Sequence, residues 1–247
     1  MELIKAVFNG KFDSLENIKV SPFSRAYTFS DSIYEVVPFY NLQPIAYGKH
    51  INRLQYSADA LSIKINLDII SDEIKKLISL CKSKSGYVYY QVTRGQDSIR
   101  SHIHSNDVEL ETFGYVLPHT FETKFLKIMI CKDLRWGRCD IKTVSLLPNV
   151  LAKQDAYIKG ASEAWLINKE GHITEGCASN AWILRKDNTL ITHPSNNSIL
   201  TGITRTSFIK GLKKHSIKFK ELKFKMKDVR SAKEAFATSA TQHVTPV

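Results

Sequence analysis

Residues 133–156 read DLRWGRCDIKTVSLLPNVLAKQDA, and Lys142 lies near the centre of this stretch. Apolar and polar residues alternate over residues 139–142 before an apolar run, which predicts a short strand. Pro148 suits the first turn of a helix, so a helix should begin near it. Burial among apolar neighbours would lower the pKa of the Lys142 amine and free its lone pair, as a Schiff-base lysine requires. The rule that lysines are exposed favours a surface residue, so this stretch alone leaves both interpretations open.

Three other segments place donor or charged groups where a small anion or a ring can be bound. An arginine and two histidines share one loop in VTRGQDSIRSHIH (92–104), and a guanidinium offers a fork of donors to a carboxylate. A glutamate precedes a glycine in ITEGCASN (173–180). In ITHPSNNSILTGITR (191–205), residues 202–204 open a helix, whose amides and dipole favour an anion. The paired histidines also suggest a metal, but no further ligands are apparent at suitable spacing, so we expect none.

With FATSATQHVTPV (236–247), these motifs resemble the fold-type IV pyridoxal-phosphate-dependent aminotransferases, and among them the D-amino acid aminotransferases. The resemblance runs from about Phe8 to Val247. It implies an α/β (α+β) fold with a small N-terminal α/β lobe and a larger, strand-rich C-terminal lobe. It also implies pyridoxal 5'-phosphate as cofactor, and transamination of D-amino acids with a 2-oxo acid such as 2-oxoglutarate as acceptor.

The resemblance assigns cofactor contacts along the chain. The residue matching Lys142 forms a Schiff base with the cofactor and moves the α-proton. The residue matching Glu175 keeps the ring nitrogen protonated, which the electron-sink chemistry needs. Leu200 matches the apolar residue that packs on the ring. Four other residues match contacts to the phosphate: Arg53, Ile203, Thr204 and Ser239. Ala240 departs from the pattern, which has a threonine there, so a hydroxyl contact worth about 1 kcal/mol is absent.

Substrate binding is implied for Tyr34, Arg100 and His102, which match the residues that bind the substrate carboxylate. In the family the Arg–His loop comes from the neighbouring subunit, so the resemblance implies a homodimer with shared active sites. Two relatives carry the same lysine and glutamate but do not use this loop in that way. They are the branched-chain L-amino acid aminotransferases and the 4-amino-4-deoxychorismate lyases, and both remain alternatives.

Composition places the chain among ordinary globular proteins, since 43% of its 247 residues are hydrophobic and 24% are charged. No apolar run approaches the ~20 residues that span a bilayer. The first residues, MELIKAVFNG, lack the apolar core of a signal peptide, so we expect a cytoplasmic protein without membrane contact. The four cysteines show no framework spacing, which predicts reduced thiols.

The net charge of +11 raises the alternative of nucleic-acid binding. The densest basic segment is Lys210–Lys227, in which Leu222, Phe224 and Met226 alternate with lysines. Such alternation predicts a strand with one buried and one solvated face, and no nucleic-acid-binding motif accompanies it. We therefore expect no nucleic-acid partner. The rival from another class is a non-catalytic basic binding protein on a decayed scaffold.

Pro118 lies in the segment that marks a boundary between two lobes. We predict a small N-terminal α/β domain over residues 1–118 and a larger cofactor-binding domain over 119–247, shorter at its C-terminus than the family pattern. Apolar spacing predicts helices over residues 50–61 and 71–82, the second capped by Ser71.

Overall fold

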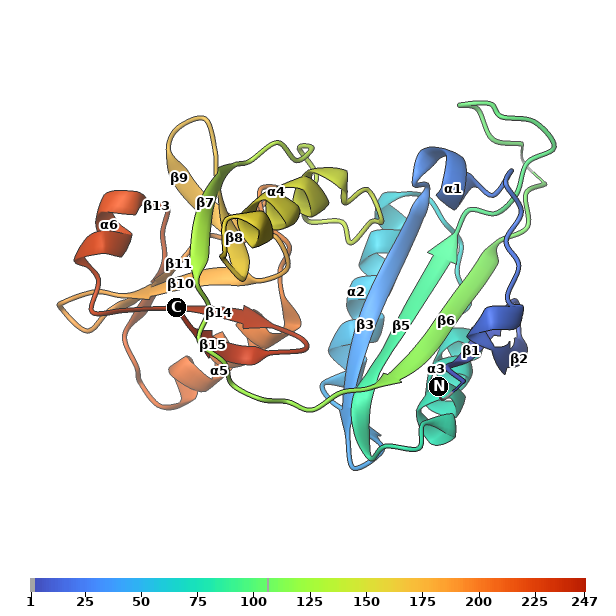
Figure 1. Ribbon diagram of the computed structural model, residues 1–247, viewed down its shortest axis with the longest axis horizontal. Coiled ribbons are helices and arrows are strands. Elements are labelled where there is room, and N and C mark those ends of the chain that lie inside the picture. The colour runs from blue at the N-terminus through green and yellow to red at the C-terminus, as the bar shows by residue number, and fades with distance from the viewer. Residues whose placement is uncertain (1–2, 106) are drawn as a thin grey trace. The chain divides into compact units, whose positions relative to one another are not determined.

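The computed structural model describes residues 3–105 and 107–247, which fold into two compact units. The N-terminal unit comprises Met1–Thr120 with Ile141–Ser145, and the C-terminal unit comprises Phe121–Asp140 with Leu146–Val247. Both are built mainly of sheets with a few helices (Figure 1), so the predicted mixed α/β, strand-rich fold is confirmed. The two units are of nearly equal length, so the C-terminal unit is not the larger one in this chain.

The N-terminal unit contains a six-stranded sheet in the order β2-β1-β6-β5-β3-β4. Its strand pairs are antiparallel, and the long β3–β5 and β5–β6 ladders form its middle. In order, its elements are β1 (Lys5–Phe8), β2 (Lys11–Ser14), η1 (Leu15–Asn17), α1 (Arg25–Phe29), β3 (Ser32–Tyr40), β4 (Gln43–Pro44), α2 (Tyr47–Ala60), α3 (Leu67–Leu80), β5 (Ser85–Thr93) and β6 (Glu111–Pro118).

Helices α2 and α3 pack on one face of this sheet (Figure 1). Alternate residues of β3 point to that face, and Ile33, Val37 and Phe39 are fully buried there. The helix expected over 50–61 is confirmed as α2, but α3 begins earlier than predicted. Its cap is Asn66, whose side chain accepts from the amides of Asp68 and Ile69, so Ser71 lies inside the helix.

The segment that carries Lys142 contains no regular strand, so the strand predicted there is wrong. It makes one isolated bridge to β3, between Ile33 and Thr143. The amide of Thr143 bonds the carbonyl of Ile141, which curls the chain instead of extending it. The bridge nevertheless attaches this segment to the N-terminal unit, whereas the sequence analysis assigned it to the second domain.

The C-terminal unit holds a five-stranded sheet, ordered β12-β11-β10-β14-β15, and a four-stranded sheet, ordered β13-β9-β8-β7. Helix α4 begins beside Pro148, as predicted. The elements are β7 (Ile128–Lys132), α4 (Leu147–Ile158), β8 (Glu163–Ile167), β9 (His172–Gly176), β10 (Asn180–Leu184), β11 (Leu190–Thr192), α5 (Ile203–Lys214), β12 (Phe219–Glu221), β13 (Phe224–Lys225), α6 (Met226–Ser231), β14 (Glu234–Ser239) and β15 (His243–Pro246).

Aromatic packing fixes α5 against the five-stranded sheet. The Trp182 ring stacks on Phe236 with centroids 5.6 Å apart, and Phe208 of α5 meets the Trp182 ring edge-on at 5.2 Å. The single strand predicted in the basic segment is wrong. Only the two residues of β13 pair with β9, and the chain then turns into α6, where the Asp228 carboxylate accepts from the Lys225 amide.

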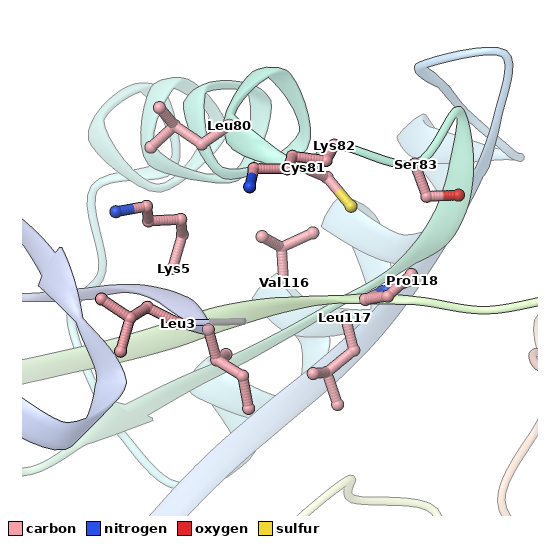
Figure 2. Close-up of a pocket in the computed structure, with 10 residues that line it drawn as sticks. Leu3, Lys5, Leu80, Cys81, Lys82, Ser83, Val116, Leu117 and Pro118 are labelled. Carbon is pink, nitrogen blue, oxygen red and sulfur yellow. The ribbon is translucent and has the colours of Figure 1, made fainter. Parts of the chain in front are cut away.

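A cavity of about 560 Å³ lies at one end of the N-terminal unit (Figure 2). Its walls come from the start of β1, the end of α3 and the end of β6, and include Leu3, Lys5, Cys81, Val116 and Pro118. None of the predicted site residues lines it. Among the described residues, no helix has the length and apolarity that crossing a bilayer requires, and no cluster of metal-ligating side chains occurs.

Candidate functional site

Glu175 lies near the end of β9 and is only 5% exposed. Its Oε1 accepts hydrogen bonds from the Leu200 amide at 3.0 Å and from the Arg135 guanidinium, and its Oε2 accepts from the Asn180 side-chain amide at 2.8 Å. Burial raises the pKa of the Glu175 carboxyl to about 7, although Arg135 and the Leu200 amide act in the opposite direction. The result is a buried carboxyl group whose charge depends on its immediate partners.

Arg135 connects Glu175 to a second carboxylate. Its Nε donates to Asp133 Oδ1 at 2.9 Å and its Nη2 to Asp133 Oδ2 at 2.8 Å, a bidentate pair. The sequence analysis missed Asp133, Arg135 and Asn180. All three stand inside segments that it quoted. Arg135 contacts Glu175 across 40 residues of chain, and a contact at that distance leaves no local spacing signal.

Asn180 joins the Glu175 carboxylate to the start of α5. Its Nδ2 donates to Glu175 and also to the Leu200 carbonyl at 2.8 Å. A Cβ placed on Gly202 would lie 2.2 Å from Asn180 Oδ1, so a larger residue would displace the Asn180 side chain or the start of α5. Gly202 is also the N-cap of α5, and it offers no side-chain oxygen to the amides of the first turn.

Thr204 and Ser239 meet beside that first turn. The Thr204 hydroxyl donates to the Ser239 carbonyl at 2.8 Å, which ties α5 to the end of β14. The Ser239 hydroxyl in turn accepts from the Gln242 amide at 3.2 Å. Backbone amides and hydroxyls near a helix N-terminus favour a phosphate or another anion.

Lys142 contacts Tyr34 in the N-terminal unit. Its Nζ lies 4.0 Å from the centroid of the Tyr34 ring, and its carbonyl accepts from the Tyr34 amide at 3.0 Å. The Lys142 amide donates to the Ser57 hydroxyl of α2 at 3.1 Å. The backbone on both sides of this half-buried lysine is therefore held by β3 and α2.

Tyr34 also belongs to a row of aromatic side chains on the sheet face opposite α2 and α3. Its ring stacks on Tyr89 with centroids 5.4 Å apart, and Tyr89 stacks on Tyr115 at 5.2 Å. The Tyr89 hydroxyl donates to Gln91 Oε1 at 2.7 Å. Three adjacent strands, β3, β5 and β6, thus fix the position of Tyr34.

Arg53 is held by a buried acidic partner. Its Nε donates to Glu35 Oε1 at 2.6 Å and its Nη2 to Oε2 at 2.9 Å, while His50 Nδ1 lies 2.8 Å from Oε2. Burial alone would raise the pKa of Glu35, but Arg53 and His50 together lower it to about 2. The sequence analysis missed Glu35 and His50; Glu35 follows Tyr34 and points to the opposite face of β3.

Arg100 and His102 are exposed on the loop after β5 and gather around Phe29. The Arg100 guanidinium carbon lies 4.7 Å from the Phe29 ring centroid, and the His102 ring lies 5.2 Å from it. Buried Arg25 donates to the carbonyls of Ser101 at 2.8 Å and of His102 at 3.3 Å. The loop backbone is therefore anchored while both predicted carboxylate ligands stay accessible.

The structure brings most predicted residues together within each unit. In the C-terminal unit one network contains Glu175 and Leu200, and it reaches the α5 start that carries Ile203, Thr204 and, across from it, Ser239. In the N-terminal unit Lys142 contacts Tyr34, whereas Arg53 lies on the Glu35 face of β3 and Arg100 and His102 share their own loop.

Comparison with known proteins identifies the family. Residues 32–247 match the family model described as amino-transferase class IV. A D-alanine aminotransferase of Listeria monocytogenes is 36% identical over 253 residues, covering 99% of this chain and 86% of that protein. One from Staphylococcus aureus is 36% identical over 250 residues, covering 98% of this chain and 88% of that protein.

Solved structures show the same fold. The branched-chain amino acid aminotransferase of Escherichia coli superposes with a TM-score of 0.89 at 22% identity, covering 100% of this chain and 86% of that one. The branched-chain aminotransferase of the thermophilic archaeon Thermoproteus uzoniensis, solved with norvaline, gives a TM-score of 0.88 at 20% identity, covering 100% and 86%. This chain belongs to the class IV aminotransferase family.

Proposed function

We propose that this chain is a pyridoxal-phosphate-dependent transaminase that acts on D-amino acids of the D-alanine type, with a 2-oxo acid such as 2-oxoglutarate as acceptor. The proposal includes a cytoplasmic homodimer whose subunits share their active sites. Relatives named D-alanine aminotransferase match this chain over nearly its full length, which supports the substrate class. The structural observation that carries the proposal is the Asn180 link between a buried carboxylate and an open helix N-terminus.

The residues of the C-terminal unit fit this cofactor at both of its polar ends. The closeness of Gly202 to Asn180 makes a cradle that a Cβ would fill, at the start of a helix whose N-cap residue has no side chain to bond the first amides. Glu175 supplies a buried acceptor at the other end of the same network. A phosphate and a protonated pyridine nitrogen are the complementary groups.

Each residue has a definable task toward the cofactor. When bound, the cofactor supplies the aldehyde and the electron-withdrawing ring on which amino-group transfer depends. The amides of Ile203 and Thr204 and the hydroxyl of Ser239 hold the phosphate, assisted by Arg53. Leu200 packs on the ring, and Glu175 holds the proton at the ring nitrogen.

Lys142 would serve as the covalent anchor of the cofactor and as the base that takes the α-proton of the substrate. Its contact with the Tyr34 ring keeps the amine beside the residue proposed to bind the substrate carboxylate. Arg100 and His102 complete that carboxylate site from the partner subunit, and their anchored, exposed loop supports this task.

An absorption spectrum of the purified protein, recorded before and after adding D-alanine or L-alanine, tests the proposal. We expect a cofactor band that D-alanine changes and L-alanine does not. A colourless protein that takes up no cofactor, yet binds polyanions in a salt-sensitive way, would instead support the non-catalytic alternative.

A second assay separates transamination from the lyase alternative. With D-alanine as substrate, pyruvate should form only when 2-oxoglutarate is present, because the amino group needs an acceptor. Elimination of pyruvate from 4-amino-4-deoxychorismate without any oxo acid would identify a lyase. A cofactor absorption band that responds to branched-chain L-amino acids would identify a branched-chain L-amino acid aminotransferase.

A further inference from the structure

We infer that Arg135 is a positioning residue that favours the ionised form of Glu175 and holds its carboxylate in place for the ring nitrogen of the cofactor. This inference rests on the proposed function, in which Glu175 holds the ring nitrogen in its protonated form. It concerns a residue that lies seven positions before Lys142 and contacts Glu175 within the C-terminal unit.

The geometry of Arg135 is suited to this task. Asp133 occupies Nε and Nη2 of the guanidinium, which turns the remaining Nη1 toward Glu175 Oε1. Nη2 also donates to the Ser198 carbonyl at 2.9 Å. A guanidinium held at three places cannot rotate away, so it delivers a fixed positive charge to one oxygen of Glu175.

Burial makes that charge important. The side chains of Arg135 and Glu175 are each 6% exposed and that of Asp133 is 11% exposed, so water screens their interaction little. The three groups carry a net charge of −1 when ionised. A protonated ring nitrogen would bring the total to zero, whereas a neutral one would leave a buried charge uncompensated.

The hydrogen bonds leave room for that nitrogen. Oε1 of Glu175 already accepts from Arg135 and the Leu200 amide, while Oε2 accepts from Asn180 as its one donor in the described part of the chain. A carboxylate oxygen can accept two hydrogen bonds, so Oε2 keeps capacity for a further N–H. The titratable groups that face Glu175 are Asp133, Arg135 and the Cys139 thiol.

Without Arg135, Glu175 would take up a proton. Burial, with a smaller contribution from the Asp133 charge, raises its pKa to about 7 even in the presence of the guanidinium. A protonated Glu175 donates a hydrogen bond instead of accepting one, so the ring nitrogen would lose its proton and the ring its electron-withdrawing power.

The competing explanation is that Arg135 only ties segments together, since it also bonds Thr174 and Ser198. The two explanations differ in what they predict for a cofactor analogue without the ring nitrogen. The probes are pyridoxal 5'-phosphate and its 1-deaza analogue, in which carbon replaces that nitrogen. The measurement is the dissociation constant of each probe for the full chain at neutral pH.

The variants are R135Q, R135K and, as a matched control, R138Q, whose arginine forms the same bidentate pair with Asp140. We expect the wild type and R138Q to prefer pyridoxal phosphate over the analogue. R135Q should lose about tenfold or more of this preference, because a neutral Glu175 no longer favours a protonated nitrogen. R135K keeps the charge and should retain most of the preference.

If R135Q binds both probes more weakly by the same factor, the inference is overturned, and Arg135 only holds neighbouring segments together. If R135Q does not fold, R135K decides: its ammonium keeps a positive charge beside Glu175, so the preference for pyridoxal phosphate should remain, and loss of that preference in a folded R135K overturns the inference. A wild-type protein that binds no pyridoxal phosphate would refute the proposed function itself, which is a separate result.

Discussion

Tyr34 and Glu175 are held in place by different kinds of interaction. The Tyr34 ring contacts Lys142 Nζ, 4.0 Å from its centroid, and the Tyr89 ring, at a centroid distance of 5.4 Å. Glu175 is held by hydrogen bonds from three directions in a buried place. The first residue is positioned by stacking and the second by charge, so changes at the two should have different consequences.

Tyr89→Leu should raise the KM for D-alanine about fivefold, because an aromatic pair worth about 1 kcal/mol no longer holds Tyr34. Tyr89→Phe keeps the stacked ring and serves as the control, with a KM close to that of the wild type. Steady-state kinetics of the three proteins provide the measurement. An unchanged KM in the leucine variant would contradict a role for stacking.

Glu175→Gln should change the dependence of stability on pH in the absence of cofactor. The folded pKa of about 7 lies above the ordinary value of 4.5, so this carboxyl favours the folded state most below pH 4.5 and loses that contribution as the pH rises to 7. The variant lacks this loss. Relative to the wild type it should gain up to roughly 3 kcal/mol in unfolding free energy between pH 5 and pH 8.

Urea unfolding at several pH values measures this difference, with Glu35→Gln as the matched control. The pKa of Glu35 is lowered to about 2, so its stabilising contribution is present above 4.5 and is lost as the pH falls. The two variants should therefore show opposite trends. A pH-independent difference for Glu175→Gln would contradict the raised pKa.

At the scale of elements, α5 and β10 approach each other closely at one point. Asn180 begins β10 and Gly202 caps α5, and the approach leaves no space for a Cβ. The same helix contains a second glycine, Gly211, with no heavy atom within 4 Å of the position that a Cβ would occupy. One helix thus offers both a glycine that packing requires and one that it does not.

Gly202→Ala should weaken pyridoxal phosphate binding by tenfold or more, because either Asn180 or the start of α5 must shift. Gly211→Ala is the control and should stabilise the protein by about 0.5–1 kcal/mol through helix propensity. Cofactor titration and thermal unfolding of both variants test this. Wild-type affinity in Gly202→Ala would show that the close approach is unimportant for the cofactor.

At the scale of the whole molecule, the proposal requires two copies of the chain. If the Arg100 loop serves the partner's site, Lys142→Ala dimers are inactive, and Arg100→Ala dimers, whose KM is raised, have little activity at a low D-alanine concentration. Refolding the two variants together creates hybrids in which one site has both residues intact. About a quarter of all sites then become wild-type, and activity should return to about that fraction. No gain over the separate variants would contradict shared sites.

The sequence predicted the helices α2 and α5 and the motif residues because apolar periodicity and glycine positions are local signals. It failed where tertiary contacts decide. The segment at Lys142 is curled rather than extended because it bridges β3, and α3 starts at an Asn66 cap that the analysis did not weigh. The partners of Glu175 and Arg53 were missed because an ion pair between distant segments leaves no periodic pattern.

The proposed function depends on a covalent link between Lys142 and the cofactor. Borohydride reduction of the cofactor-loaded protein, followed by peptide mapping, tests it most directly because reduction makes the link permanent. We expect one phosphopyridoxyl group, on the peptide that contains Lys142. A label on another lysine, or no label on a protein that has bound the cofactor, would contradict it.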